Sequence, residues 1–251
     1  MKFDHLAWAA LLYYYKSSTD RKYVKLFRDT EFISRLRERP WDVSYEEFER
    51  KVISGFISSI GLQLPGLKSE DDILAKIVEL HPFISSIQGV HLLHCDLSSG
   101  QLLESLWQIY DTLSAIQGLW ITGISKIAHV LNESLFVTVN ISTLSHFGLL
   151  EGREDFIEWL RIAQRNAQEA DEDFHNLGFN GSPQQFLSEK LGYANYDCQK
   201  SLARFIDEYF WLVVAENLPI PPTWLPWSSR LPVQPLSVQD PDVDSNSPGQ
   251  D

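Results

Sequence analysis

The sequence contains little cysteine and methionine, with two cysteines and one methionine in 251 residues. Cys95 and Cys198 lie far apart and form neither a Cys-x-x-Cys motif nor a Cys/His spacing typical of metal ligands. This scarcity excludes a disulfide-rich secreted scaffold and a zinc finger. We therefore expect two reduced, half-buried thiols in an intracellular protein.

Long hydrophobic runs are also absent. The apolar segment at residues 1–15 is too short to cross a bilayer, and Asp4 and His5 interrupt it. It has no convincing cleavage site for a signal peptide, so we interpret it as a core helix. No other segment is apolar for long enough to span a membrane, which predicts a soluble protein with no membrane partner.

The familiar catalytic motifs are missing as well. The sequence has no Gly-x-Ser-x-Gly, no P-loop, no Gly-x-Gly-x-x-Gly and no His-Glu-x-x-His. His91, His94 and Asp96 lie close together, but spacing fixes no further ligand, so partly buried, hydrogen-bonded histidines are the simpler interpretation. The acidic run 169–173 lacks the glycine and residue order of a calcium loop and predicts a solvated helix face. We expect no metal and no cofactor.

Positive charge is scarce overall but concentrated locally. The formal net charge of -13 opposes nonspecific attraction to DNA or to an anionic membrane. Residues 16–39 are nonetheless basic, whereas residues 151–172 and the segment from Asp240 are acidic. The basic residues of 16–39 are Lys16, Arg21, Lys22, Lys25, Arg28, Arg35, Arg37 and Arg39. Such a run usually forms a solvated helix face, and here it also permits a phosphate-bearing partner.

The hydrophobic periodicity predicts an all-α, multi-helix globular domain over residues 1–217. Apolar residues recur at three- and four-residue steps over 45–60, 73–80, 102–113, 156–162 and 202–210. Ser44 is placed to cap the first of these helices, and Gly61 to end it. Ser182 and Pro183 predict the start of another helix, because proline suits a first helical turn.

The composition changes from residue 218 onwards. Six prolines exclude helix over residues 218–236, and residues 237–251 have almost nothing to bury, so we expect that acidic end to be disordered. Trp224 and Trp227 lie in the proline-rich segment, where exposed indoles are costly. They predict either a strap across the domain surface or a motif that binds a protein partner.

The central segment, about 114–140, combines a glycine turn, a short helix and an extended apolar run. Its sequence TGISKIAHVLNESLFVTVN, over 122–140, resembles the helix-hairpin-helix segment of the HhH-GPD superfamily of DNA base-excision glycosylases. It is similar to a divergent branch in which a Ser-Lys-x-Leu-His helix precedes Asn-Pro-x-Leu-Phe and an aspartate. The later segment SLARFIDEYFW, over 201–211, resembles a closing helix of that branch.

The resemblance implies a DNA glycosylase-like fold and a role for particular residues. A tight glycine turn at a helix N-terminus can bind a phosphate backbone, which assigns nucleic-acid contacts to Gly118, Gly123, Ser125 and Lys126. The family's catalytic aspartate corresponds to Asn140. An amide cannot accept a proton or supply that negative charge, so base excision should be weak or lost.

Two further residues of this segment have alternative interpretations. Lys126 is too close to Asn140 to match the nucleophilic lysine of the superfamily, so it either contacts a phosphate or covers a surface. His129, on the same helix face, either packs between helices or lines a pocket.

Three functional hypotheses follow. The first is a glycosylase-like protein that binds DNA but has little or no base-excision activity. The second is a helical protein–protein interaction module without nucleic-acid binding. The third is an active enzyme whose acid lies elsewhere, for example at Asp207 or Glu208. Convergence of Lys126, Arg153 and the N-terminal arginines on one cleft would favour nucleic acid, and scatter would disfavour it.

Overall fold

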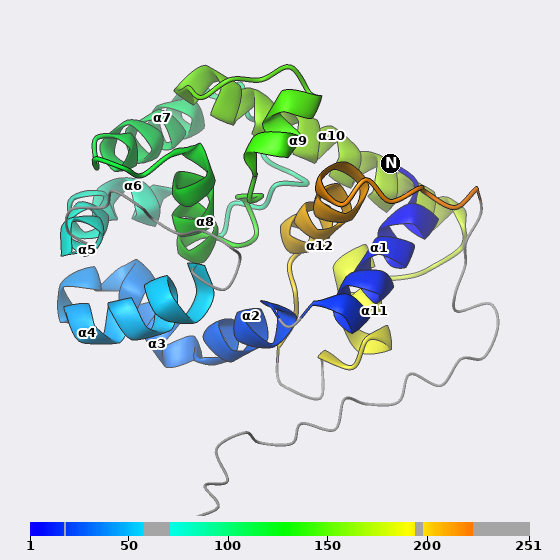
Figure 1. The fold of residues 1–251 in the computed structure, drawn as a ribbon, viewed down its shortest axis with the longest axis horizontal. Coiled ribbons are helices and arrows are strands. Elements are labelled where there is room, and N and C mark those ends of the chain that lie inside the picture. Colours follow the sequence, from blue (N-terminus) through cyan, green and yellow to red (C-terminus); the bar gives the residue numbers. More distant parts are fainter. Residues whose placement is uncertain (18, 58–70, 194–197, 223–251) are drawn as a thin grey trace, which may run out of the picture.

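The computed structural model describes residues 1–17, 19–57, 71–193 and 198–222. All the regular structure in these ranges is helical, as the periodicity predicted (Figure 1). Within the same ranges no helix is both long enough and apolar enough to cross a bilayer. The predicted end of the first periodic segment at Gly61, the Trp224 and Trp227 pair and the acidic residues from 237 lie outside the described residues.

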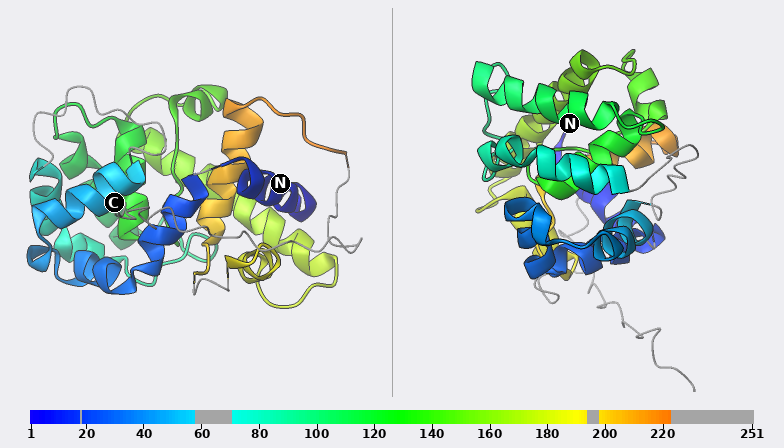
Figure 2. Two further views of the ribbon diagram at one scale, coloured as in Figure 1. Left: turned by 60° about the horizontal axis from the view of Figure 1, so that its bottom comes forward. Right: turned by 90° about the vertical axis from the view of Figure 1, so that its left-hand side faces the viewer.

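The helices form two groups that are joined by α2 (Thr19–Arg28) (Figures 1 and 2). The first group comprises α3 (Thr30–Glu38), the 3-10 turn η1 (Pro40–Asp42), α4 (Tyr45–Phe48), η2 (Glu49–Ile57), α5 (Asp71–Glu79), α6 (His81–Ser86), α7 (Gly100–Ser114) and α8 (Ile121–Leu131). The second comprises α1 (Phe3–Lys16), α10 (Arg153–Asn176), α11 (Pro183–Lys190) and α12 (Leu202–Phe210). The short α9 (Ile141–His146) packs on η5 (Trp211–Ala215), which continues α12.

Serine caps begin several helices where the sequence places them. The Ser44 hydroxyl accepts a hydrogen bond from the Glu47 amide at 3.2 Å, and Ser182 accepts one from Gln185 at 3.3 Å. The helix that Ser44 starts becomes a wider π-helical coil from Glu49. Gly55 suits that coil, because a Cβ added there would lie 2.7 Å from the Arg50 carbonyl oxygen.

The N-terminal segment forms the core helix that the sequence predicted. Phe3, Leu6 and Ala10 of α1 are fully buried, and α1 packs on α10 and α12. Every residue of α8 is also buried. A helix that is enclosed on all sides occupies the centre of a domain rather than its surface.

A non-helical segment, residues 132–140, returns from α8 through the core. Asn132 fixes its start, since the side-chain amide donates to the carbonyls of Ile87 at 2.8 Å and Val90 at 3.1 Å. Trp159 of α10 fixes its middle, with the indole nitrogen donating to the Val137 carbonyl at 2.9 Å. The extended run predicted before Asn140 is therefore held by side chains rather than by a partner strand.

Replacing Trp159 should test this arrangement. We expect Trp159→Ala to lower the free energy of unfolding by about 3–5 kcal/mol, because it leaves a cavity and an unpaired buried carbonyl. Trp120→Ala is the matched control, since this indole is 63% exposed and its loss should cost less than about 0.5 kcal/mol. Urea unfolding followed by circular dichroism measures both, and equal losses would contradict the assignment.

Candidate functional site

The segment that resembles a glycosylase hairpin lies partly inside the molecule. Gly118 forms the predicted turn between α7 and α8, with a backbone φ of +89° that favours glycine. Gly123 does not bound this turn, because α8 begins at Ile121 and Gly123 is one of its buried residues. One of the two glycines therefore makes the turn, and the other lies within the helix.

Ser125 is buried and has a packing role. Its hydroxyl donates to the Thr122 carbonyl at 3.0 Å and accepts a hydrogen bond from the Val139 amide at 3.1 Å. These bonds join α8 to the returning segment 132–140. The Ser125 side chain is fully buried, so its hydroxyl is not exposed at the surface.

Lys126 is only 4% exposed, so the expectation that it covers a surface is wrong. Burial lowers the pKa of its ammonium to about 8, although the Asp207 carboxylate raises that pKa and the Arg204 guanidinium lowers it. Lys126 is thus an internal cation that lies within electrostatic range of α12.

His129 is fully buried between helices, as one interpretation of the sequence predicted. Its Nδ1 atom lies 2.6 Å from the Phe136 carbonyl oxygen, and its ring contacts Tyr23 and Phe27. Burial lowers its pKa to about 3, so the ring stays neutral at physiological pH.

Asn140 caps α9. Its side-chain oxygen accepts a hydrogen bond from the Thr143 amide at 2.8 Å, and its backbone is extended as in other N-caps. The structure brings Ser125 next to Val139, one residue before Asn140. Lys126, in contrast, interacts with α12.

The strongest concentration of interior charge involves residues that the resemblance did not highlight as a group. We call it the buried charge cluster; its members are Asp20, Lys126, Lys200, Arg204, Asp207 and Glu208. Lys200 is fully buried, and its Nζ atom lies 2.5 Å from an oxygen of Asp20 and 2.5 Å from one of Glu208. Arg204 pairs with Asp207 and lies 3.2 Å from Glu208.

Tyrosines complete the hydrogen bonding of the cluster. Lys200 donates to the Tyr193 hydroxyl at 2.8 Å, and Tyr193 donates to Asp20. Arg204 donates to the Tyr13 hydroxyl at 2.9 Å. The cluster therefore ties α1 and α2 to α12 and to the segment that precedes it.

Two carboxylates of the cluster share one ammonium. The pKa of Glu208 is raised to about 7, chiefly by burial; Lys200 and Arg204 lower this pKa, and the nearby charge of Asp20 raises it. The buried charge cluster contains three acidic and three basic side chains, so its net charge is zero when all six are ionised. The sequence held a signal for part of this cluster, because Arg204 and Glu208 are four residues apart on one face of α12, and Lys200 precedes Arg204 by the same step.

A cavity of about 280 Å³ opens beside the cluster. His91, His94, Glu133, Lys200 and Ser201 are among the residues that line it. Its volume is just below the range typical of small-molecule sites. In the described part of the chain, no three side chains of His, Cys, Asp or Glu come together where they could hold a metal ion.

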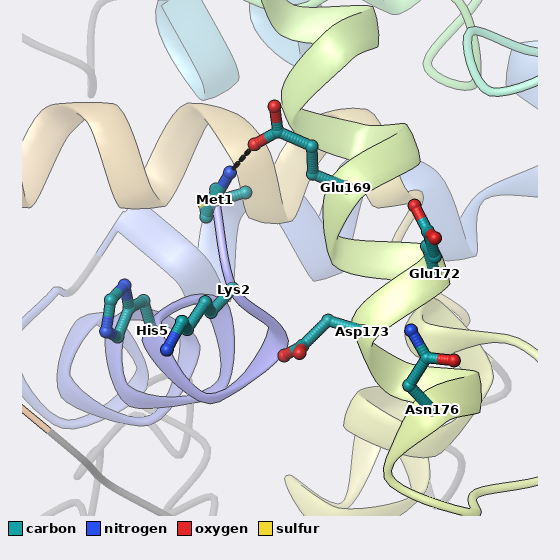
Figure 3. Close-up of a pocket in the computed structure, with 7 residues that line it drawn as sticks. All are labelled: Met1, Lys2, His5, Glu169, Glu172, Asp173 and Asn176. Carbon is teal, nitrogen blue, oxygen red and sulfur yellow. Dashed lines mark hydrogen bonds and ion pairs between the residues drawn. The ribbon is translucent and has the colours of Figure 1, made fainter.

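A second hollow of about 380 Å³ lies between the start of α1 and the end of α10 (Figure 3). Glu169 pairs with the amino group of Met1, and the Phe3 amide donates to Asp173 at 2.8 Å. These acids thus hold α1 against α10. Glu172, also at the rim, is exposed, as expected for a solvated acidic face.

The cations that were expected to define a nucleic-acid cleft are scattered. Arg37 donates to the Val130 carbonyl at 2.8 Å and pairs with Glu133, and Arg35 pairs with Glu47 at 2.8 Å. Arg153 pairs with Asp111 at 2.9 Å on α7, away from α2. By our own criterion, this scatter argues against a cleft built from these residues.

A different cationic surface is present on α2. Arg21, Lys22, Lys25 and Arg28 are all exposed, whereas Tyr23 and Leu26 on the opposite side are buried. No ion pair joins any of the four to a carboxylate in the part of the chain that the structure describes. We call these four residues the α2 basic face.

No protein-family model, no curated protein and no solved structure matches the chain. The local geometry is therefore the basis for any functional assignment.

The pKa of Glu208 gives a measurable signature. A carboxyl whose pKa is about 7 in the folded state and 4.5 in the unfolded state contributes stability that is complete below pH 4.5 and is lost as the pH rises through 7. The quantity to follow is the unfolding free energy of the native protein minus that of the Glu208→Gln variant. We expect this difference to fall by on the order of 2 kcal/mol as the pH rises from 4.5 through 7. Urea unfolding at several pH values measures it. A difference that is constant or rises would contradict the assignment.

Proposed function

We propose that this protein binds nucleic acid through the α2 basic face and has little or no base-excision activity. The observation that carries the proposal is the unpaired charge of α2 in a chain whose net charge is -13. Most other cations of the described residues are neutralised locally. The ion-paired ones are Arg35, Arg37, Arg39, Lys51, Lys76, Arg153, Arg161, Arg165, Lys200 and Arg204.

The spacing of the α2 cations suits a linear polyanion. Arg21, Lys25 and Arg28 are four and three residues apart, so they follow one stripe of the helix at steps of about 5–6 Å. Tyr15, at the end of α1 just before α2 in the sequence, is 62% exposed. Proteins that bind single-stranded nucleic acid commonly combine exposed aromatic rings with cations, because the rings stack on bases.

The glycosylase-like part of the proposal rests on the sequence resemblance and on the order of the elements. The α7 helix, the Gly118 turn and α8 supply the helix-turn-helix order that the resemblance implies. Gly123, Ser125 and Lys126 of α8 are buried, so the phosphate contacts that the resemblance assigns to them need another surface. For this reason we assign the main contacts to α2.

Binding should depend on salt and on the α2 cations. We expect a fluorescent single-stranded oligonucleotide to bind at 25 mM salt and to lose affinity linearly on a log–log plot as salt rises to 200 mM, by anisotropy. Lys25→Glu/Arg28→Glu should weaken binding about tenfold or more at low salt, and should lower the salt slope by about 1.4.

The matched control is Arg161→Glu/Arg165→Glu, which changes the net charge equally on α10, where both arginines pair with Glu158. This variant should bind much more tightly than the α2 variant. Equal loss in the two variants would contradict a specific role of α2, and no salt-sensitive binding by the native protein would overturn the proposed function.

Asn140 permits a separate test of catalysis. We expect the native protein to release no base from damaged or mismatched duplexes, because the amide cannot act as the family's aspartate does. Asn140→Asp keeps a good N-cap for α9, so it tests the chemistry without removing the cap. Excision gained in this variant would support the assignment. Robust excision by the native protein that is unchanged in Asn140→Ala would show that another residue is responsible.

A protein–protein interaction module is the second candidate. Trp41 is 57% exposed with its ring against His81, and Tyr45 and Val78 are also exposed. These residues come from η1, α4 and α5, which pack together, and such surface apolar groups are common in protein interfaces. This candidate becomes the better one if the oligonucleotide measurements show no binding.

A further inference from the structure

We infer that the acidic segment 240–251 binds the α2 basic face and competes there with nucleic acid. The contact within the chain stands on charge and geometry, whereas the competition rests on the proposed function. The α2 basic face is a row of exposed cations with no carboxylate partner in the described ranges. It therefore lacks the neutralising carboxylates that most other cations of the described residues have.

The acidic segment has the complementary charge. After Arg230 the sequence contains four acidic residues and no basic one; the acids are Asp240, Asp242, Asp244 and Asp251. Three of them, Asp240, Asp242 and Asp244, alternate with other residues, and a proline at 241 disfavours a helix there. In an extended chain, residues two apart point to the same side at steps of about 6.6 Å.

This repeat is close to that of the helix stripe. Arg21, Lys25 and Arg28 lie about 5–6 Å apart along α2, so three carboxylates at steps of about 6.6 Å can each approach one cation. Lys22 lies beside the stripe and adds a fourth positive charge. The remaining surface is less suitable, because a chain with a net charge of -13 repels an acidic segment wherever its cations are already paired.

The segment is also long enough to reach α2. Seventeen residues separate Pro222, the last described residue, from Asp240, and such a chain spans at most about 60 Å. A folded domain of this size has a radius of gyration of about 17 Å. Because both partners belong to one chain, the segment has a high effective concentration at the helix.

Carbodiimide cross-linking of the full chain tests the contact without nucleic acid. At 25 mM salt we expect amide links from Asp240, Asp242 or Asp244 to Lys22 or Lys25, detected by mass spectrometry in the monomer fraction. The links should disappear at 500 mM salt. They should also disappear in the Lys25→Glu/Arg28→Glu variant, in which Lys22 is the cross-linking site that is measured. Lys190, exposed on α11, is the internal comparison. Absence of links at low salt, or equal yields at Lys190, would overturn the inference.

Neutralising the segment tests the competition. Asp240→Asn/Asp242→Asn/Asp244→Asn should bind a single-stranded oligonucleotide about tenfold more tightly than the native chain at 50 mM salt, with a smaller gain at 200 mM. Glu46→Gln/Glu172→Gln/Glu216→Gln is the control, because it changes the net charge equally at exposed positions elsewhere. Equal affinities in the native chain and the segment variant would overturn the competition.

The two proposals can fail separately. If neither the native chain nor the segment variant binds nucleic acid while the salt-sensitive cross-links form, the proposed function is wrong and the contact within the chain remains. If the native chain binds nucleic acid through α2 and no cross-links form, the inference is wrong and the proposed function remains.

Discussion

The buried charge cluster is the constraint on which the rest of the fold depends. Lys200 has no access to solvent, and removing such a charge from water is costly unless opposite charges and hydrogen bonds surround it. Asp20 and Glu208 supply those charges, and Tyr193 accepts one of its hydrogen bonds. Since Asp20 belongs to α2 and Glu208 to α12, segments nearly two hundred residues apart must meet before the lysine is satisfied.

The cluster also explains the position of α2. One side of this helix is directed inwards by Tyr23, Leu26 and the carboxylate of Asp20. Its four cations are consequently directed outwards, where no acidic residue of the described chain neutralises them. The same tertiary contact that satisfies an internal lysine thus leaves a basic surface on an acidic protein. That surface is the feature from which both functional proposals start.

The resemblance to glycosylases assigned DNA contacts and catalysis to particular residues, and the structure gives several of these residues a structural role. Ser125 and Asn140 occupy positions that the resemblance connects with DNA, and both have structural hydrogen bonds here. A side chain that caps a helix or joins two segments is retained for the fold even without catalysis. Ser125 therefore joins α8 to the returning segment, and Asn140 begins α9.

Local signals in the sequence were enough to predict the helical class, several of the helices and the starts of two of them. Periodic apolar residues, Ser44 and Ser182 are local signals, so they specify helices whatever the rest of the chain does. The burial of α1 also followed from its composition. The tertiary structure decided which polar residues lie inside. The sequence of α8 alone favoured a surface position for Lys126, whereas the charges that shift its pKa, Asp207 and Arg204, come from α12. Likewise, the basic segment 16–39 divides into paired arginines on α3 and unpaired cations on α2, because only the packing of distant helices determines where a carboxylate is within reach.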